Sequence, residues 1–329
     1  MFSWRPEEEP FISAVRSDLF AIEPKVAYAS WLEDQGDSRA AFLRELIEAQ
    51  ENETPFPDSD AMAKDWLQQL GYLLLKEATE LGLDEFAEDV TKIARQAIEI
   101  THEEIADDQI PIGASKFNGD PDLPADFQWP TYIENPNEQT EVPLLFIAQI
   151  ALTELQSLHS DSDLPRSGLL SVFGSMGDGI EPRGEDGDCR VFCFPESTTL
   201  QRRPQPDCHK EWTYYKPARI AFESCWDLPD AEDDWVDAHP PMAEQLKWNF
   251  DDEELVERLR ESVWSDSHLF GYSIHQRTCN PSPGPEWQHL LTLGSVCEWC
   301  WCDGEHLAIF VHREDMKAGK FDRVFGYCS

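Results

Sequence analysis

Residues 295–306, SVCEWCWCDGEH, place three cysteines, two tryptophans and a histidine within twelve positions. Cys297 and Cys300 form a Cys-x-x-Cys pair, and Cys279 and Cys302 could complete four thiolate ligands for a structural zinc ion. The same thiols could instead be redox-active, or buried in a packed core as free cysteines often are. Metal binding, redox chemistry and simple packing are therefore the three interpretations of this segment.

The residues between these cysteines favour packing. Neither Gly nor Pro separates Cys297 from Cys300, and side chains alternate along a strand, so these two thiols would point to opposite faces. Cys300 and Cys302 would share a face about 6.6 Å apart, which is unsuitable for an easy bridge. We expect buried thiols in a core strand that runs into a hairpin turn at Asp303-Gly304, with the four-cysteine zinc site as a weaker alternative and no cofactor.

Several polar side chains near the ends of expected strands are candidates for binding a small ligand. Gln149 is an amide inside the apolar run FIAQI, and burial requires it to have a hydrogen-bond partner, either loop backbone or a ligand in a pocket. His275 and Gln276 in GYSIHQ could orient a polar ligand, or lie near a strand end with ordinary partners. Trp129 and Asp126 lie beside rigid prolines, in a fixed loop or a recognition edge.

The composition is strongly acidic, with 65 Asp and Glu against 26 Lys and Arg and a formal charge of −39. Such a surface repels nucleic acids and anionic membranes, and it attracts a basic protein partner unless it serves solubility alone. The acids are densest in Asp227–Glu254. The partner-binding candidates within that stretch are Asp230, Glu232, Asp233, Asp234 and Asp237.

Catalytic and targeting signals are not found in the sequence. It contains no Walker loop, no Gly-x-Ser-x-Gly elbow and no His-Glu-x-x-His helix, and its many acids single out no general acid–base pair, so no catalytic residue is assigned. The first ten residues lack the basic and apolar regions of a secretory signal, and the run VPLLFIAQIAL is too short to span a bilayer. Nine cysteines then indicate reduced thiols in the cytoplasm.

The local patterns predict an α+β protein with two parts. Residues 38–50 place apolar side chains on one helix face behind a Ser38 cap, and residues 84–100 do the same behind Asp84. From about Ile110, strand-length apolar runs alternate with turn residues. We expect a helical module over residues 1–105 and a mostly antiparallel, β-rich domain over residues 106–329. The apolar positions of the second helical segment are Phe86, Val90, Ile93, Ala97 and Ile100.

Residues 26–50, VAYASWLEDQGDSRAAFLRELIEAQ, resemble the planctomycete-type repeat-companion domain, a short helical module. The resemblance implies helix faces and a turn and brings no activity. Its matching residues are Tyr28, Ala29, Trp31, Leu32, Glu33, Gly36, Asp37, Arg39, Phe42 and Leu43.

Six phrases from residues 112–324 resemble the YwqG-like family in content and order. They include IGASKFNGDPDLPADFQWP, PLLFIAQIALTEL, LPRSGLLSVFG and WCDGEHLAIFVHREDMKAGKFDRV. That family is a domain of unknown function with an α+β fold rich in sheet, so the resemblance implies a fold and no reaction. The cysteines at 297, 300 and 302 are not part of the family pattern.

Two functions follow as hypotheses. The first is a non-enzymatic acidic interaction protein, such as an inhibitor or immunity-type factor, that binds a basic protein in the cytoplasm. The second is a small-molecule-binding or hydrolytic domain with a pocket around Gln149, Trp129, His275 and Gln276.

Overall fold

The computed structural model describes residues 5–80, 94–135, 140–156, 163–175, 187–207, 215–228, 266–273 and 284–328, with the single positions 82, 91, 158 and 182. The chain divides into two units, Met1–Gln96 with Ser224–Trp264, and Ala97–Glu223 with Ser265–Ser329. Helices make up most of residues 9–80, and an antiparallel sheet dominates the second unit, which confirms the predicted α+β class. None of the helices in the described part of the chain is long and apolar enough to cross a bilayer.

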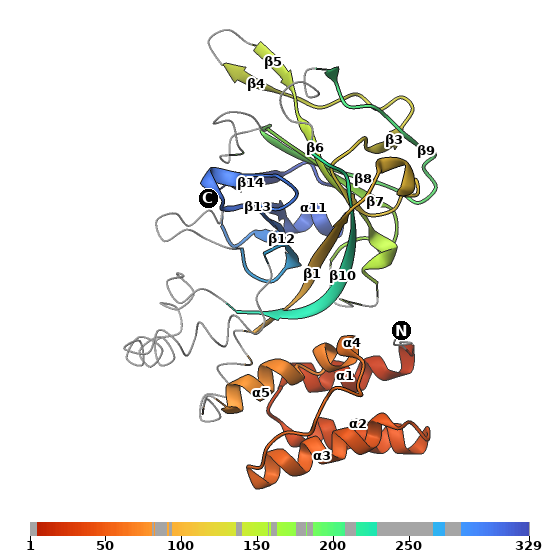
Figure 1. Cartoon of the computed structure of the whole chain (residues 1–329), viewed down its shortest axis with the longest axis vertical. Helices are drawn as coiled ribbons and strands as arrows, with labels where there is room; N and C mark the ends of the chain where they lie inside the picture. The colour runs from red at the N-terminus through yellow and green to blue at the C-terminus, as the bar shows by residue number, and fades with distance from the viewer. Residues whose placement is uncertain are drawn as a thin grey trace. The chain divides into compact units, whose positions relative to one another are not determined.

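The described helices of the first unit lie in two layers (Figure 1). α2 packs along α3, while α1 contacts α2 and α4 contacts α5. Aromatic and aliphatic side chains from all five helices form the common core. The elements are η1 (Pro6–Glu8), α1 (Glu9–Ser17), α2 (Ile22–Asp34), α3 (Arg39–Asn52), α4 (Lys64–Gln69) and α5 (Tyr72–Glu80).

The turn between α2 and α3 explains part of the repeat-companion-like motif. Gly36 adopts a positive φ of 66°, and the amide of Asp37 donates to the carbonyl of Leu32, which closes the C-terminus of α2. The Asp37 carboxylate then accepts from the amide of Arg39 at 3.0 Å and so caps α3. Ser38 occupies the predicted N-cap position but makes no side-chain capping bond, and Asp37 supplies that bond instead.

A buried carboxylate fastens the start of the chain to these helices. Glu8 has no exposed surface and accepts hydrogen bonds from Arg5 Nε at 2.6 Å, Tyr28 Oη at 2.7 Å and Arg39 Nη2 at 2.9 Å. Burial raises the pKa of Glu8, but the hydrogen bonds from Arg39, Tyr28 and Arg5 together lower it by more, so the net shift of the pKa is downward. Arg39 also pairs with Asp37 at 2.7 Å, which links the buried carboxylate to the turn.

The second unit is built on one antiparallel sheet, which contains ten strands among the described residues (Figure 1). The strand order is β14-β13-β12-β11-β1-β10-β2-β6-β7-β8, and two ribbons, β3–β9 and β4–β5, lie outside it. The sheet strands are β1 (Arg95–Glu104), β2 (Lys116–Phe117), β6 (Leu145–Ala151), β7 (Leu169–Gly174), β8 (Cys189–Phe194), β10 (Ala218–Asp227), β11 (His268–Phe270), β12 (Trp287–Gly294), β13 (His306–His312) and β14 (Val324–Cys328). The ribbon strands are β3 (Asp122–Pro124), β9 (Leu200–Arg202), β4 (Thr131–Asn135) and β5 (Thr140–Pro143), and the short helices are η3 (Asp107–Gln109), η4 (Leu152–Glu154), η6 (Trp301–Asp303) and α11 (Arg313–Lys317).

β1 contradicts the helix predicted over residues 84–100. Ala97 and Ile100 were placed on a helix face, but both lie in the strand, where Ala97 pairs with Phe270 and Ile98 with Leu269 of β11. The segment Ala97–Thr101 is rich in β-branched residues, which suit a half-buried strand. Tertiary pairing with β11 therefore overrides the apparent helical period, and residues 84–90 lie outside the described part.

The sheet has apolar residues on both faces. Ile147, Leu170 and Val191 contribute to a large core on one face, whereas Phe146 and Phe173 belong to a separate aromatic cluster on the other. Residues alternate between these two sets along β6, β7 and β8, as expected for strands buried on both sides. One face of these strands therefore contributes to the large core, and the other face is covered by the aromatic cluster, to which Leu123 of β3 and Tyr132 of β4 belong.

The two edge strands of the sheet, β8 and β14, come into contact with each other. A Cβ atom at Gly326 of β14 would lie 2.5 Å from Cβ of Cys189 in β8, so only glycine permits this approach. Next to it, the amide of Cys328 donates to the carbonyl of Pro182 at 2.7 Å. The sheet therefore curls until its edges meet, which protects both from pairing with other chains.

Lys25 lies inside the first unit with no exposed surface. Its Nζ donates to the carbonyl of Leu19 at 2.6 Å and to that of Ala21 at 2.9 Å, which holds the connection between α1 and α2. Burial disfavours the charged ammonium and lowers the pKa of Lys25 to about 8, although Asp18 opposes the shift.

We expect Glu8→Ala to lower the free energy of unfolding by about 3 kcal/mol, because it leaves Tyr28 and two arginines without their buried acceptor. The neighbouring Glu7→Ala is the matched control, since Glu7 is exposed and its removal should change stability by less than about 0.5 kcal/mol. Urea denaturation of both variants measures the difference. Equal effects would show that burial of Glu8 does not matter.

The lowered pKa of Lys25 predicts that the free energy of unfolding depends on pH. Between about pH 8 and pH 10.5 the unfolded chain holds the Lys25 proton and the native state does not, so this group makes the free energy of unfolding rise with pH. In Lys25→Met that contribution is lost. The difference in unfolding free energy between wild type and variant should grow from pH 7 to pH 10 by at most about 3 kcal/mol. A difference that stays constant with pH would contradict a lowered pKa.

Candidate functional site

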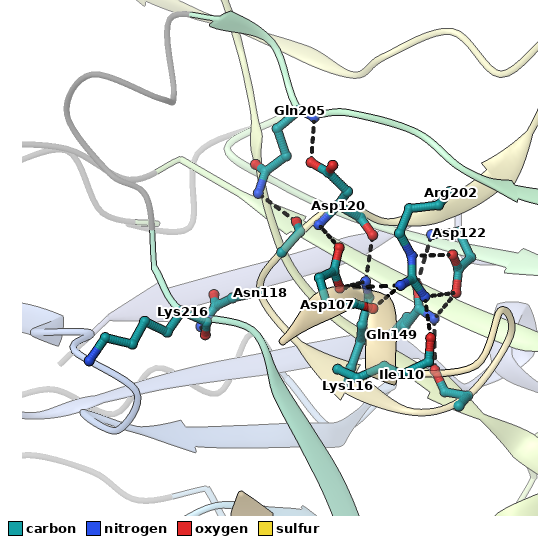
Figure 2. A network of polar contacts seen from close by, with 12 residues as sticks. Asp107, Ile110, Lys116, Asn118, Asp120, Asp122, Gln149, Arg202, Gln205 and Lys216 are labelled. Atoms are coloured by element: carbon teal, nitrogen blue, oxygen red, sulfur yellow. Dashed lines mark hydrogen bonds and ion pairs between the residues drawn. The ribbon is translucent and has the colours of Figure 1, made fainter. Parts of the chain in front are cut away.

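A network of charged and polar side chains lies between the sheet and the β3–β9 ribbon (Figure 2). Lys116 of β2 and Gln149 of β6 are direct neighbours across the sheet, and Asp122 of β3 is paired with Arg202 of β9. Asp107 of η3 completes the network from the segment before β2. Five elements distant in sequence thus bring their polar groups to one place.

Gln149 is fully buried and its amide is used within the protein. Its Oε1 accepts from the backbone amide of Asp122 at 2.9 Å, and its Nε2 donates to the carbonyl of Ala114 and to Asp122 Oδ2, each at 2.7 Å. Two of these three partners are backbone groups, as one of the two interpretations of this residue predicted, and the third is the Asp122 carboxylate. The amide therefore connects the sheet to the start of the ribbon.

Asp122 has no exposed surface and receives hydrogen bonds from three directions. Arg202 Nε donates to Oδ1 at 3.0 Å, while the amide of Gly113 and the Gln149 amide donate to Oδ2. Arg202 in turn donates to the carbonyls of Ile110 and Asp107, so one guanidinium joins the ribbon to the preceding loop. Burial lowers the pKa of Arg202, but its bonds and charge interactions with Asp122, with further contributions from neighbouring acids, raise it overall.

Lys116 is the second cation of the network, and it has no exposed surface. Its Nζ lies 2.6 Å from Asp107 Oδ1, also donates to the carbonyl of Asp120, and lies 6.0 Å from the centroid of the Phe146 ring. Burial lowers the pKa of Lys116, and the bond to Asp107 only partly offsets this. Lys116 therefore acts as an internal counter-ion that holds the loop around residues 107–120.

The hydrogen bonds and ion pairs of this network serve to hold the structure together. The two carboxylates are engaged by cations and amides, and the amide of Gln149 makes three hydrogen bonds, so the geometry fixes the ribbon on the sheet. An acid or base for catalysis must instead be able to reach a substrate. The network is thus a rigid support for the loops that leave it.

One of those loops carries two further predicted site residues. Trp129 is half-buried, and its Nε1 donates to the carbonyl of Leu144 at 2.8 Å. Asp126 is exposed three residues earlier. His275 and Gln276 lie outside the described residues, so the structure brings only Gln149 and Trp129 to the same face of the sheet. All five partner-binding candidates between 230 and 237 also lie outside the described residues.

The segment 295–305 does not form the core strand predicted from its sequence. It is a turn between β12 and β13, in which Cys297 and Glu298 have positive φ values of 51° and 68° and Trp301–Asp303 form the short helix η6. Two indoles hold the turn in place, because Trp299 Nε1 donates to Asn118 Oδ1 at 3.0 Å and Trp301 Nε1 donates to the carbonyl of Gly294 at 3.2 Å. The tryptophans are thus buried by a folded turn rather than by strand alternation.

The thiols of this turn differ in exposure. Cys297 is buried and Cys300 is exposed, and burial raises the pKa of Cys297 to about 11, which disfavours the reactive thiolate. Over the part of the chain that the structure describes, no group of three or more His, Cys, Asp or Glu side chains could hold a metal ion. Cys279, the fourth zinc-ligand candidate, lies outside that part.

A second buried polar cluster on β11 and β12 was not anticipated from the sequence. His289 contacts the carbonyl of Phe270 through Nδ1 at 2.7 Å and Thr292 Oγ1 through Nε2 at 2.8 Å. A carbonyl only accepts, so in the neutral ring Nδ1 donates and Nε2 accepts from Thr292. His268 lies beside it, with ring centroids 5.4 Å apart, and its Nε2 contacts the carbonyl of Tyr272.

Sequence reasoning missed four of the five network residues and both of these histidines. Asp107, Asp122 and Arg202 look like ordinary loop or edge charges in a chain with 65 acids. Lys116 carried the only local signal, because it lies in the short segment ASKFNGD directly before a buried phenylalanine. A lysine in that position must either reach solvent or find a buried partner.

These features define a class of protein: an antiparallel sheet domain whose outer ribbon is fastened by buried ion pairs. The chain belongs to the family described as Domain of unknown function (DUF1963), whose family model matches residues 115–328. This is the family that the YwqG-like phrases indicated. No curated protein matches the chain. The repeat-companion resemblance of residues 26–50 stays a prediction.

We expect Gln149→Met to lower the free energy of unfolding by about 3 kcal/mol, because the Asp122 amide and the Ala114 carbonyl lose their bonds to Gln149 and the Asp122 carboxylate loses one donor, while the side-chain volume hardly changes. Gln201→Met, an exposed position on β9, is the matched control and should be nearly neutral. Chemical denaturation followed by fluorescence provides the comparison. A stable Gln149→Met variant would mean that the network is dispensable.

Proposed function

We propose that this chain is a non-enzymatic interaction protein that binds a basic protein through its negative surface, for example as an inhibitor or immunity-type factor. The observation that carries the proposal is the formal charge of −39. Among the described residues, four Lys and Arg side chains are held mostly inside the protein and do little to reduce the negative potential at the surface. The proposal goes beyond the family assignment, which brings no activity.

The burial of four cations supports this interpretation. Lys25 and Lys116 have no exposed surface, and the side chains of Arg39 and Arg202 are only 13% and 20% exposed. Each of these four residues stabilises carbonyls or carboxylates inside its own unit. Their charges consequently contribute little attraction for anions in solution.

Exposed carboxylates are also present on regular structure. Glu45, Glu48 and Glu51 of α3 are exposed, and spacings of three residues bring them to one side of the helix. None of the three is ion-paired within the described ranges of the chain. Helix α3 therefore presents negative charge to solvent without local compensation.

A charge of this size has kinetic consequences for binding. Complementary potentials raise the association rate of a basic partner, and salt weakens the effect by screening. The densest acidic segment, with Asp230, Glu232, Asp233, Asp234 and Asp237, remains the proposed contact region on the strength of its sequence. The small-molecule alternative is not favoured by Gln149, whose amide is already used inside the protein.

The test is capture of a partner from the native cell extract at low and at moderate salt. We expect a basic protein in stoichiometric amount that is released as salt rises. Lysine at Asp230, Glu232, Asp233, Asp234 and Asp237 should abolish capture. Lysine at the exposed positions Glu23, Asp34, Asp60, Asp108 and Asp322 changes the net charge equally and should weaken capture only slightly.

The control variant distinguishes a contact made by residues 230–237 from the electrostatic effect of the total net charge. Equal loss in both variants would contradict a defined contact region between 230 and 237. A chain that captures no basic protein at either salt concentration would overturn the proposed function.

A further inference from the structure

A set of half-buried aromatic rings covers the outer face of β6, β7 and β8. We call it the aromatic face. Its rings lie over the buried side chains of Phe146 and Phe173. The members are Phe127, Trp129, Tyr132, Phe192 and Phe194.

The rings form one continuous cluster. Phe127 lies 4.9 Å from Phe192 and 5.5 Å from Phe194, edge to face in both cases, while Phe192 and Phe194 are stacked at 6.4 Å with an interplanar angle of 7°. Trp129 continues the cluster through an edge contact with Phe173 at 5.4 Å. Clusters of incompletely buried aromatic rings are typical of binding surfaces.

The aromatic face is held rigidly from below. Arg203 Nη1 donates to the carbonyls of Pro124 and Phe127 at 3.2 and 2.8 Å, and Trp129 Nε1 donates to the carbonyl of Leu144. The Asp122 network fixes the strand from which this loop starts. Rigid aromatic side chains lose little conformational entropy on binding, which is why they act as anchors in interfaces.

We propose that the aromatic face binds arginine side chains of a basic protein segment. A guanidinium group stacks on an aromatic ring and is attracted by its negative face. Two exposed acids are close to the rings in sequence, Asp126 directly before Phe127 and Glu196 two residues after Phe194. Arg190, two residues before Phe192, has interactions of its own, and Arg203 is committed to carbonyls.

Charge selects the occupant. A second copy of a chain with a charge of −39 would be repelled, as would nucleic acids or anionic membranes, whereas an arginine-rich segment is attracted over a distance and then held by the rings. The inference rests on the proposed function, because it names the surface at which the basic partner makes its short-range contacts. It adds a preference for arginine over lysine that charge alone does not produce.

The experiment measures binding of nona-arginine and nona-lysine peptides to the full chain at about 0.15 M salt. We expect nona-arginine to bind about fivefold more tightly than nona-lysine. The double variant Phe192→Leu/Phe194→Leu should lose this preference. Phe192→Tyr/Phe194→Tyr keeps the rings and should keep it, which guards against an effect of misfolding.

The matched control is Phe20→Leu/Phe56→Leu, which shortens two half-buried phenylalanines of the first unit and should leave the preference intact. If neither peptide binds, the proposed function fails together with the inference. If both peptides bind equally well and the Leu variant changes nothing, only the inference is overturned. Sedimentation that shows a dimer lost in the Leu variant would assign the face to a second copy and also overturn it.

Discussion

The compensation of the Asp122 charge is the interaction on which the outer layer of the second unit depends. Asp122 has no exposed surface, so its carboxylate must be neutralised where it lies. Arg202 supplies the compensating charge from β9, and Gln149 donates a hydrogen bond from β6, so the carboxylate joins the ribbon to the sheet. The loop that leads from Asp122 to Trp129 begins at this joint, and the aromatic face is positioned by it.

The first unit applies the same principle to Glu8, which is neutralised by Arg39 and Arg5. Both units thus place a buried carboxylate where segments distant in sequence must meet, and both use arginine because its planar group satisfies several acceptors at once. With only 26 Lys and Arg in the chain, cations used inside are not available outside. The buried cations of the two units therefore contribute little to offsetting the acids at the surface.

Much of this fold could be predicted from sequence because its signals are local. The apolar runs that were predicted as strands contain β6, β7 and β13. The Gln149 amide within an apolar strand also indicated that it has a buried hydrogen-bond partner. The identity of that partner could not be predicted, since Asp122 and Arg202 are 80 residues apart and neither differs from an ordinary surface charge. β1 was misread as a helix because the three-residue spacing of Ala97 and Ile100 matches a helical turn, whereas in the strand they lie on opposite faces, and it is the pairing with β11 that selects the strand.

The strand order of the sheet has a consequence for the synthesis of the protein. β1, which begins at Arg95, lies between β10 and β11, and its partner β11 begins at His268. Contacts of such long sequence separation form slowly, and they cannot form at all before the later strand has left the ribosome. The helices up to Glu80 pack locally and can fold early, whereas β1 must wait for about half of the chain. During that interval its apolar residues are exposed, which makes the nascent chain of the second unit a natural client for chaperones.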